Sequence, residues 1–199
     1  MGVNIELQFP DYSERTIYIN EEINPDSAGR FISALNNIDS DDANIARNTI
    51  ERLKYLGVQA TGIELPPIKV MLNSPGGYVY DALAIYDMIN RRSDIVCVCN
   101  GKVMSAAVLV LCAFDKSLRV ATENTTFMIH QPSSATWGKL KDMQEDVEET
   151  KRLHKLMTGI YLKSTDIPKE LLDRIYNEKT DYYFTAKEAL KLGLINKII

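Results

Sequence analysis

Two short apolar runs on either side of a helical segment constrain the fold of this chain most. The runs IKVML (68–72) and IVCVC (95–99) have the length and composition of strands, and residues 79–90 between them show helical spacing. The turn NSPGG precedes the helical segment, and a further helix opens near Ser105 after the second run. Strand and helix therefore alternate, which predicts the α/β class.

Two more strands and a helix are predicted before this region. Residues 3–9 alternate apolar and polar side chains, and RTIYIN (15–20) does so less regularly, so both are expected to be strands. Pro25 suits the first turn of a helix that runs through Leu35.

A charged segment follows that helix and is interpreted as a separate surface helix. Its apolar residues recur at helical spacing from Asp39 to Tyr55, and Gly57 is a plausible end. The connection 39–67 is therefore expected to carry an extra helix on the surface.

The second half of the chain continues the alternation and contains one unusually long helix. SLRVA and TFMIH predict strands, and residues 138–163 predict a helix with an apolar stripe and a charged outer face. The length of this helix suggests a protruding arm. A short helix is expected after Pro168, another from Thr185 to Leu192 that ends at Gly193, and a last strand in LINKII.

Composition limits the class of protein. A chain of 199 residues fits one domain over residues 1–199, and the net charge of −4 disfavours nucleic acid and anionic membranes as partners. The longest apolar run is too short to span a bilayer, and the start lacks a secretion signal, so a cytoplasmic location is expected. Cys97, Cys99 and Cys112 lack zinc spacing and are interpreted as buried, reduced thiols.

One hydroxyl in the apolar stretch GKVMSAAVLVLCAF raises the question of function. A serine such as Ser105 usually bonds a carbonyl one turn back in its helix and has only a structural role. The Pro-Gly-Gly turn at 75–77 and the single His130 in MIHQP are equally weak signals alone. No local pattern among these residues decides whether their role is structural or catalytic.

The order of the motifs is more specific. NSPGG, a helix containing AIYDMI, a serine in GKVMSAA, then MIHQP and TDYYFTAKEALKLGLINKI together resemble the ClpP family of serine peptidases from Arg15 to the C-terminus. The resemblance implies a ClpP/crotonase-like spiral of ββα units with a protruding long-helix handle. It also implies a self-compartmentalising serine endopeptidase of stacked homo-oligomeric rings that cleaves unfolded proteins or peptides and needs no cofactor or metal.

Carried over by position, the resemblance makes Ser105 the nucleophile, His130 the general base and Asp181 the carboxylate that orients the histidine. This set can perform acyl transfer, because an imidazole activates the hydroxyl and a carboxylate holds the imidazole tautomer. The implied oxyanion hole consists of the backbone amides of Gly77 and Ala106. The residues assigned to substrate binding are Gly76, which also serves the turn, and Gln131, Pro132 and Ser133.

Several positions depart from the family pattern. Val103 and Ala107 occupy the glycine places of a Gly-x-Ser-x-Gly elbow, and Ser133 begins a segment that is usually rich in glycine. Lys69 and Met71 stand where the family often has aromatic docking residues, and only fourteen residues precede Arg15. An AAA+ unfoldase partner is therefore left open.

Three alternatives accompany this interpretation. One is a phage or virus head-maturation peptidase of the same fold, which would act on scaffold protein without an unfoldase. Another is an acyl-CoA enzyme of the related crotonase fold, which has no need of a Ser, His, Asp set. The third is a catalytically silent ring subunit, against which the intact triad of residue types argues.

Overall fold

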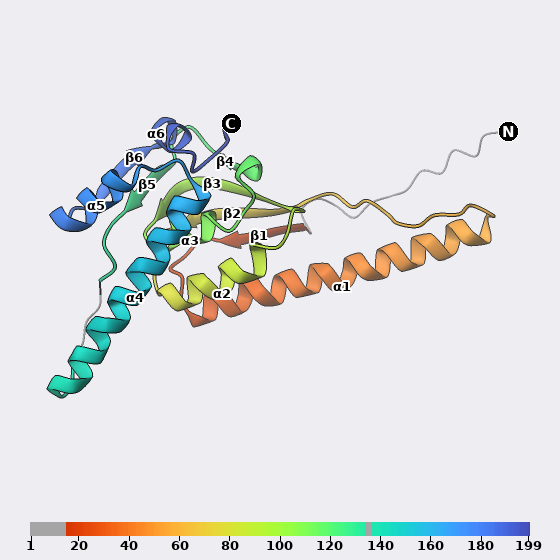
Figure 1. The fold of residues 1–199 in the computed structure, drawn as a ribbon. Coiled ribbons are helices and arrows are strands. Elements are labelled where there is room, and N and C mark those ends of the chain that lie inside the picture. Colours follow the sequence, from red (N-terminus) through yellow and green to blue (C-terminus); the bar gives the residue numbers. More distant parts are fainter. Residues whose placement is uncertain (1–14, 134–136) are drawn as a thin grey trace.

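Strands and helices alternate along the chain as predicted, and the α/β class is confirmed (Figure 1). The structure is a computed structural model and describes residues 15–133 and 137–199. The strand expected over residues 3–9 lies outside the described residues. The elements are β1 (Thr16–Ile19), α1 (Pro25–Tyr55), β2 (Ile68–Ser74), α2 (Val79–Ile89), β3 (Ile95–Met104), α3 (Ala106–Leu111), β4 (Arg119–Ala121), β5 (Thr126–Ile129), α4 (Leu140–Ser164), α5 (Lys169–Glu178), β6 (Tyr182–Thr185), α6 (Ala186–Lys191) and β7 (Lys197–Ile198).

The main sheet is parallel, and its first two strands are buried on one face. Strands β1, β2, β3, β4 and β7 are neighbours in that order. Successive side chains of a strand point to opposite faces. Ile19 and Leu72 are buried on one face, whereas Tyr18 and Lys69 are exposed on the other. The helices therefore cover one face of β1 and β2 and leave exposed residues on the opposite face.

Strand β3 changes partners partway along its length. Its first part pairs with β4 through Cys97–Cys99, and its last part pairs with β5 through Lys102–Met104. Gly101 lies between the two parts with φ +67°, and a Cβ there would lie 2.8 Å from the side-chain oxygen of Asn73. Glycine allows this backbone conformation and this close approach. The change of partner brings the end of β3 beside β5.

The apolar run after Ser105 forms a helix in the core. All six residues of α3 are buried, and α2 packs against it. The three cysteines are free and buried, as predicted, and the Sγ atoms of Cys97 and Cys99 lie 3.9 Å apart. Burial raises the pKa of the Cys112 thiol to about 12. A thiol with so high a pKa stays protonated, so it is a poor nucleophile.

The two helices predicted between Pro25 and Tyr55 form one continuous helix, α1, so the predicted break is wrong. No glycine or proline interrupts residues 30–55, and nothing in this stretch forces the helix to end. Phe31 and Leu35 are buried against the body, and the buried residues of α1 end there. Residues 39–67, here called the α1 arm, extend away from the sheet (Figure 1).

Two arginines hold the base of the α1 arm. Arg15, which is 4% exposed, pairs with Asp42 of the outgoing helix and donates its Nε to the carbonyl of Pro66 in the returning segment at 2.9 Å. Arg92 pairs with Asp39 at 2.7 Å. These charge-assisted contacts give Asp39 and Asp42, which lie within the continuous helix α1, charged partners outside it. They also join both segments of the arm to the body.

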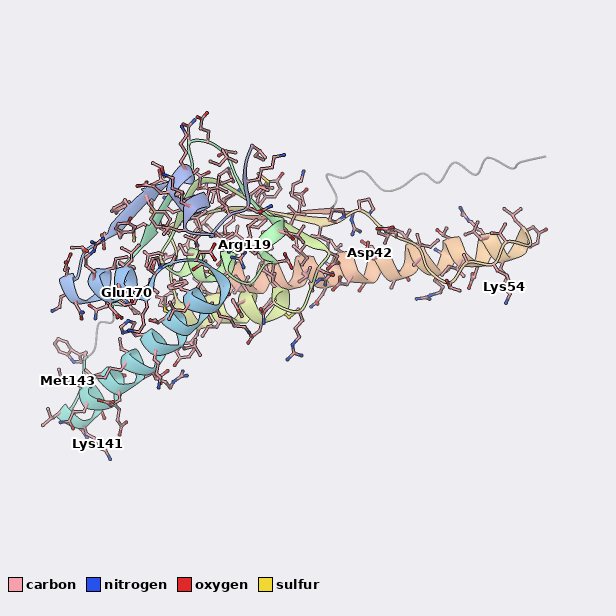
Figure 2. The ribbon with its side chains drawn as sticks, turned by 45° about the horizontal axis from the view of Figure 1, so that its top comes forward. Asp42, Lys54, Arg119, Lys141, Met143 and Glu170 are labelled. Atoms are coloured by element: carbon pink, nitrogen blue, oxygen red, sulfur yellow. The ribbon has the colours of Figure 1, made fainter. Side chains whose placement is uncertain are left out.

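The long helix predicted over residues 138–163 is confirmed as α4. It protrudes on the side of the molecule away from the α1 arm, as the positions of Lys141 and Met143 on one side and Lys54 on the other show (Figure 2). Leu140 and Val147, which belong to its apolar stripe, are 73% and 48% exposed. Over the outer half of α4, therefore, no other described part of the chain covers the stripe.

The other end of α4 is anchored in the body. Met157 and Tyr161 are buried there. The buried guanidinium of Arg119 donates to the carbonyl of Ser164 at 2.9 Å and also to the carbonyls of Cys112 and Phe114. Arg119 thus ties the end of α4 to the end of α3, and its charge has hydrogen-bond partners inside the protein.

Strand β6 is not among the predicted strands. Its four residues pair antiparallel with β5, and the rings of Phe127 and Phe184 stack with centroids 5.5 Å apart. The helix after β6 begins as predicted: Thr185 and Glu188 form a capping box, and Gly193 follows the helix with φ +65°. Within residues 15–133 and 137–199, no helix is long and apolar enough to cross a membrane.

Two leucines of α1 test the distinction between body and arm. Leu35 is fully buried, whereas Leu53 on the arm is only partly buried. Leu35→Ala should lower the free energy of unfolding by about 2–5 kcal/mol, because it leaves a cavity in the core. Leu53→Ala should cost less than about 1 kcal/mol. Urea unfolding measures both values, and equal losses would mean that the arm is as much a part of the folding unit as the core.

Candidate active site

Three segments with candidate residues meet at one edge of the sheet. The Pro-Gly-Gly turn at 75–77 follows β2, Ser105 follows β3 and His130 follows β5. These strands run parallel, with β3 between the other two. The carboxyl ends of neighbouring parallel strands lie at the same edge, which is where open α/β sheets usually bind ligands. The topology therefore brings residues that are far apart in sequence into one site.

The hydroxyl of Ser105 faces a histidine and does not cap its helix. Its Oγ lies 2.8 Å from Nε2 of His130. The backbone N–H of Ser105 donates to the carbonyl of Met128 at 2.9 Å, which continues the pairing of β3 with β5. No side-chain hydrogen bond caps α3 at this residue. The purely structural interpretation of Ser105 is therefore not what the geometry shows.

Ser105 has an unusual backbone conformation, with φ 53° and ψ −124°. The sequence lacks the glycines of a nucleophile elbow, yet the strand, the sharp turn and the helix of such an elbow are all present. A non-glycine residue in a sparsely populated region costs roughly 1–3 kcal/mol and is held there by its surroundings. This conformation places the hydroxyl beside His130, since the chain turns sharply at Ser105.

Gly76 makes that turn possible by its close approach to Ser105. A Cβ on Gly76 would lie 2.6 Å from the carbonyl oxygen of Met104, 2.7 Å from Cβ of Ser105 and 2.8 Å from the amide nitrogen of Ala106. Atoms cannot approach so closely without displacement, so a side chain at this position would push the turn away. The expectation that Gly76 serves its own turn is therefore incomplete, because Gly76 also gives Ser105 its space.

The fully buried Ser74 holds the glycine turn in place. Its hydroxyl accepts from the amide of Gly76 at 3.1 Å and donates to the carbonyl of Glu21 at 2.6 Å. Both capacities of the hydroxyl are used inside the protein, as a buried polar group requires. Ser74 therefore has a structural role in this site.

The backbone amide of Gly77 points away from the neighbouring segment at Ile23. Ile23 donates to the carbonyl of Gly76 at 2.7 Å and accepts from the amide of Tyr78 at 2.8 Å. In a parallel bridge of this kind, the N–H of the residue between the two bonded groups points to the opposite side. A Cβ on Gly77 would overlap the carbonyl of Ile23, so only glycine fits. Ala106 is the first residue of α3, where a backbone N–H has no partner within the helix.

His130 and Asp181 are brought together by the pairing of β5 with β6. Ile129 is opposite Tyr182 in this antiparallel pair, so the same register extended by one residue sets His130 opposite Asp181. Nδ1 of His130 lies 3.4 Å from Oδ1 of Asp181. That separation is long for a hydrogen bond, and catalytic contacts often tighten only when substrate binds.

The side chains of His130 and Asp181 differ in their access to solvent. The side chain of His130 is 28% exposed, and that of Asp181 is 54% exposed. Lys179 has a left-handed conformation at the end of α5, with φ 52° and ψ 41°, and this turn leads the chain to Asp181. The carboxylate is therefore positioned by a tight turn and lies near the surface.

The residues assigned to substrate binding after His130 lie along the edge of the site. Gln131 and Pro132 are partly buried and Ser133 is exposed. Residues 134–136 lie outside the described residues. The assignment of Gln131, Pro132 and Ser133 to substrate binding stays a prediction. Among the residues that the structure describes, no group of three or more His, Cys, Asp or Glu side chains could hold a metal ion.

Comparison with known proteins identifies the family. The family model described as Clp protease matches residues 30–199. A protein of Deinococcus radiodurans named ATP-dependent Clp protease proteolytic subunit is 35% identical over 159 residues, which cover 79% of this chain and 76% of that protein. The chain belongs to the Clp protease family. The resemblance based on the motif order is thus confirmed, and it assigns the chain to serine endopeptidases and not to acyl-CoA enzymes.

The strain at Ser105 leads to a stability prediction. In this Clp protease family member, Ser105→Gly should relieve the unfavourable φ, whereas Ser105→Ala should retain it. We expect Ser105→Gly to be more stable than Ser105→Ala by about 1 kcal/mol, although glycine also gains freedom in the unfolded chain. Chemical unfolding of the two variants measures this difference. A glycine variant less stable than the alanine variant would show that the turn is not strained.

Proposed function

We propose that this Clp protease family member is a self-compartmentalising serine endopeptidase in which Ser105, His130 and Asp181 form the catalytic triad. The observation that carries the proposal is the 2.8 Å approach of Ser105 Oγ to His130 Nε2, with the other ring nitrogen of His130 facing Asp181. The first contact lets the imidazole accept the proton of the hydroxyl, and the second lets the carboxylate hold the imidazole tautomer. The substrate class is unfolded protein or peptide.

The mechanism follows from these contacts. His130 accepts the proton of the Ser105 hydroxyl while the oxygen attacks the scissile carbonyl. The protonated imidazole then gives this proton to the leaving amine, which releases the first product and leaves an acyl-enzyme. His130 next activates a water that hydrolyses the ester, and Asp181 stabilises the imidazolium in both steps. No cofactor or metal is needed for this sequence.

The amides of Gly77 and Ala106 are proposed as the oxyanion hole. The bridge to Ile23 uses the groups on either side of the Gly77 amide and leaves that amide directed away from Ile23. Ala106 directly follows the nucleophile, so its amide stays close to the reacting carbonyl whatever its side chain. One donor of this type is typically worth about 3 kcal/mol in the transition state.

Substrate is proposed to bind as an added strand between two walls. One wall is the segment after Gly77, and the other is the segment after Pro132. Main-chain hydrogen bonds to an extended peptide provide affinity with little dependence on sequence. Gly76, Gln131, Pro132 and Ser133 are the residues proposed to border this cleft.

Assembly into stacked rings is supported by the exposed apolar side chains of α4. Leu140, Met143 and Val147 are all at least 40% exposed along its outer half. An apolar stripe on a protruding helix is costly in water unless another surface covers it. The covering surface is proposed to be α4 of another copy, because a symmetric contact can bury the same stripe on both chains.

An AAA+ unfoldase partner remains an open part of the proposal. Lys69 is exposed and Met71 partly buried on the uncovered face of β2, where the resemblance places docking residues. The α1 arm returns directly into β2 at Ile68, one residue before Lys69. A bulky arm and a lysine at this position favour weaker coupling to a ClpX-type unfoldase than a typical family member shows.

Substitution of the triad tests the proposed catalytic roles. Ser105→Ala or His130→Ala should lower peptide hydrolysis by roughly 10⁶-fold, since each residue is needed for the same step. Asp181→Asn should lower it by up to about 10⁴-fold, because the amide favours the wrong imidazole tautomer. Steady-state hydrolysis of an unstructured fluorogenic peptide measures these losses.

Matched controls exist for each of these changes. His154 on α4 is the second of two histidines, Ser93 is an exposed serine, and Asp173 pairs with Lys169 on α5. His154→Ala, Ser93→Ala and Asp173→Asn should retain hydrolysis within about two-fold. Full activity of His130→Ala or Ser105→Ala would refute the proposed triad.

The ring proposal is tested on Val147. Val147→Asp places a charge in the exposed apolar stripe and should lower the mass of the assembly, whereas Gln144→Asp, on an exposed polar position nearby, should not. Light scattering at micromolar concentration measures the mass, and circular dichroism checks that helix content is retained. A wild-type mass equal to one chain would contradict the proposal.

A further inference from the structure

Two residues other than glycine have a positive φ within residues 15–133 and 137–199, and both lie at the proposed triad. One is Ser105 itself, with φ 53°. The other is Lys179, with φ 52°, which precedes Asp181 by two residues. Backbone strain of this kind clusters at functional sites, because the surrounding structure must maintain it. The conformation of Lys179 is therefore examined for a role in the site.

Lys179 ends α5 in a conformation that usually belongs to glycine. Its φ and ψ of 52° and 41° are those of the left-handed region. Many helices end with one residue in this region, and glycine is the usual choice because it has no Cβ to clash with the following carbonyl. The end of the helix thus explains the turn, but it does not explain a lysine at this position.

The turn at Lys179 is anchored in the core. The backbone N–H groups of Lys179 and Thr180 both donate to the carbonyl of Ile175, and the side chain of Ile175 is buried. Two donors on one carbonyl fix the path of the chain from α5 to Thr180. Because Asp181 is the next residue, these bonds set the direction in which the chain reaches it.

The carboxylate of Asp181 has little else to hold it. Its side chain is 54% exposed, and within the described residues its one partner is His130, at 3.4 Å. The backbone after Asp181 is fixed by the pairing of Tyr182 with Ile129. A carboxylate without further hydrogen-bond donors takes its position from the backbone that carries it. The turn at Lys179 and the start of β6 are the two parts of that backbone.

We propose that Lys179 is a positioning residue whose strained left-handed turn holds Asp181 against His130. This inference rests on the proposed triad. A residue with a Cβ is confined to a small left-handed region, whereas glycine ranges over much more of positive φ. The lysine turn is therefore less favourable than a glycine turn, and it is also stiffer. Its stiffness keeps Asp181 beside the imidazolium when that charge forms in the reaction.

Replacement of Lys179 by glycine should change stability and turnover in opposite directions. Lys179→Gly relieves the strain and should raise the urea midpoint of unfolding. It should lower kcat roughly 3- to 30-fold, because Asp181 is held less closely and a small misplacement of a catalytic group can cost about 100-fold. KM should change less than about two-fold, since Asp181 acts on a charge that forms only in the reaction.

Two matched variants separate the backbone from other effects. Lys179→Asn removes the ammonium group but keeps a Cβ, and asparagine adopts the left-handed region more readily than most residues. It should recover most of the kcat that Lys179→Gly loses. Asn177→Gly places a glycine at an exposed position in the last turn of α5, before the left-handed turn. It should lower the urea midpoint and keep kcat within about two-fold.

A double-mutant cycle tests whether Lys179 acts through Asp181. In the Asp181→Asn background, Lys179→Gly should lower kcat further by less than about two-fold, because the contact that the turn supports is already impaired. A separate role in folding or substrate binding would give the same fold loss in both backgrounds. Hydrolysis of an unstructured fluorogenic peptide measures the four proteins, and the rate of fluorophosphonate labelling of Ser105 serves where hydrolysis is slow.

The outcomes separate this inference from the proposed function. Unchanged kcat in Lys179→Gly, an equally low kcat in Lys179→Asn, or a full additive loss in the Asp181→Asn background would refute the positioning role while wild-type hydrolysis still supports the peptidase. A lower urea midpoint for Lys179→Gly would contradict the strain and, with it, the proposal. A wild-type chain that does not hydrolyse peptide, or full activity of Asp181→Asn, would refute the proposed triad together with the positioning role.

Discussion

The close approach of Gly76 to Ser105 is the constraint on which the site depends. The turn after β2 and the turn after β3 share a space that would not admit one methyl group. Ser105 takes a positive φ in that space and directs its hydroxyl to His130. Ser74 and Ile23 fix the glycine turn from behind with hydrogen bonds. The geometry of the nucleophile is therefore set by backbone packing, and its own side chain contributes little to it.

The sheet explains why these groups meet. Because β3 exchanges β4 for β5 at Gly101, the ends of β2, β3 and β5 lie side by side. Strand β6 then adds antiparallel to β5 and carries Asp181 to the level of His130. Each proposed catalytic side chain follows or precedes a strand by one residue. The pairing of the strands therefore fixes the backbone positions of these residues. The two protruding elements, α4 and the α1 arm, extend to different sides of the molecule (Figure 2).

Much of this arrangement could be predicted from the sequence, because the order of its motifs resembles that of a known family. Ser105, His130 and Asp181 were identifiable by the order of the segments that contain them, and α4 by its length and spacing. The continuity of α1 was not, since the charged segment from Asp39 was interpreted as a separate helix. The ion pairs of Asp42 with Arg15 and of Asp39 with Arg92 join residues that are distant in sequence. The steric role of Gly76 and the pairing of β6 likewise depend on distances between remote segments.

The central claim is that the strained Ser105 is an activated nucleophile, and covalent trapping tests it most directly. Wild-type protein is treated with a fluorophosphonate, digested, and mapped by mass spectrometry. The account predicts one adduct, on Ser105, because only this serine has an imidazole within hydrogen-bond distance among the described residues. The absence of any adduct, or an adduct on another serine such as Ser74 with Ser105 unmodified, would contradict it.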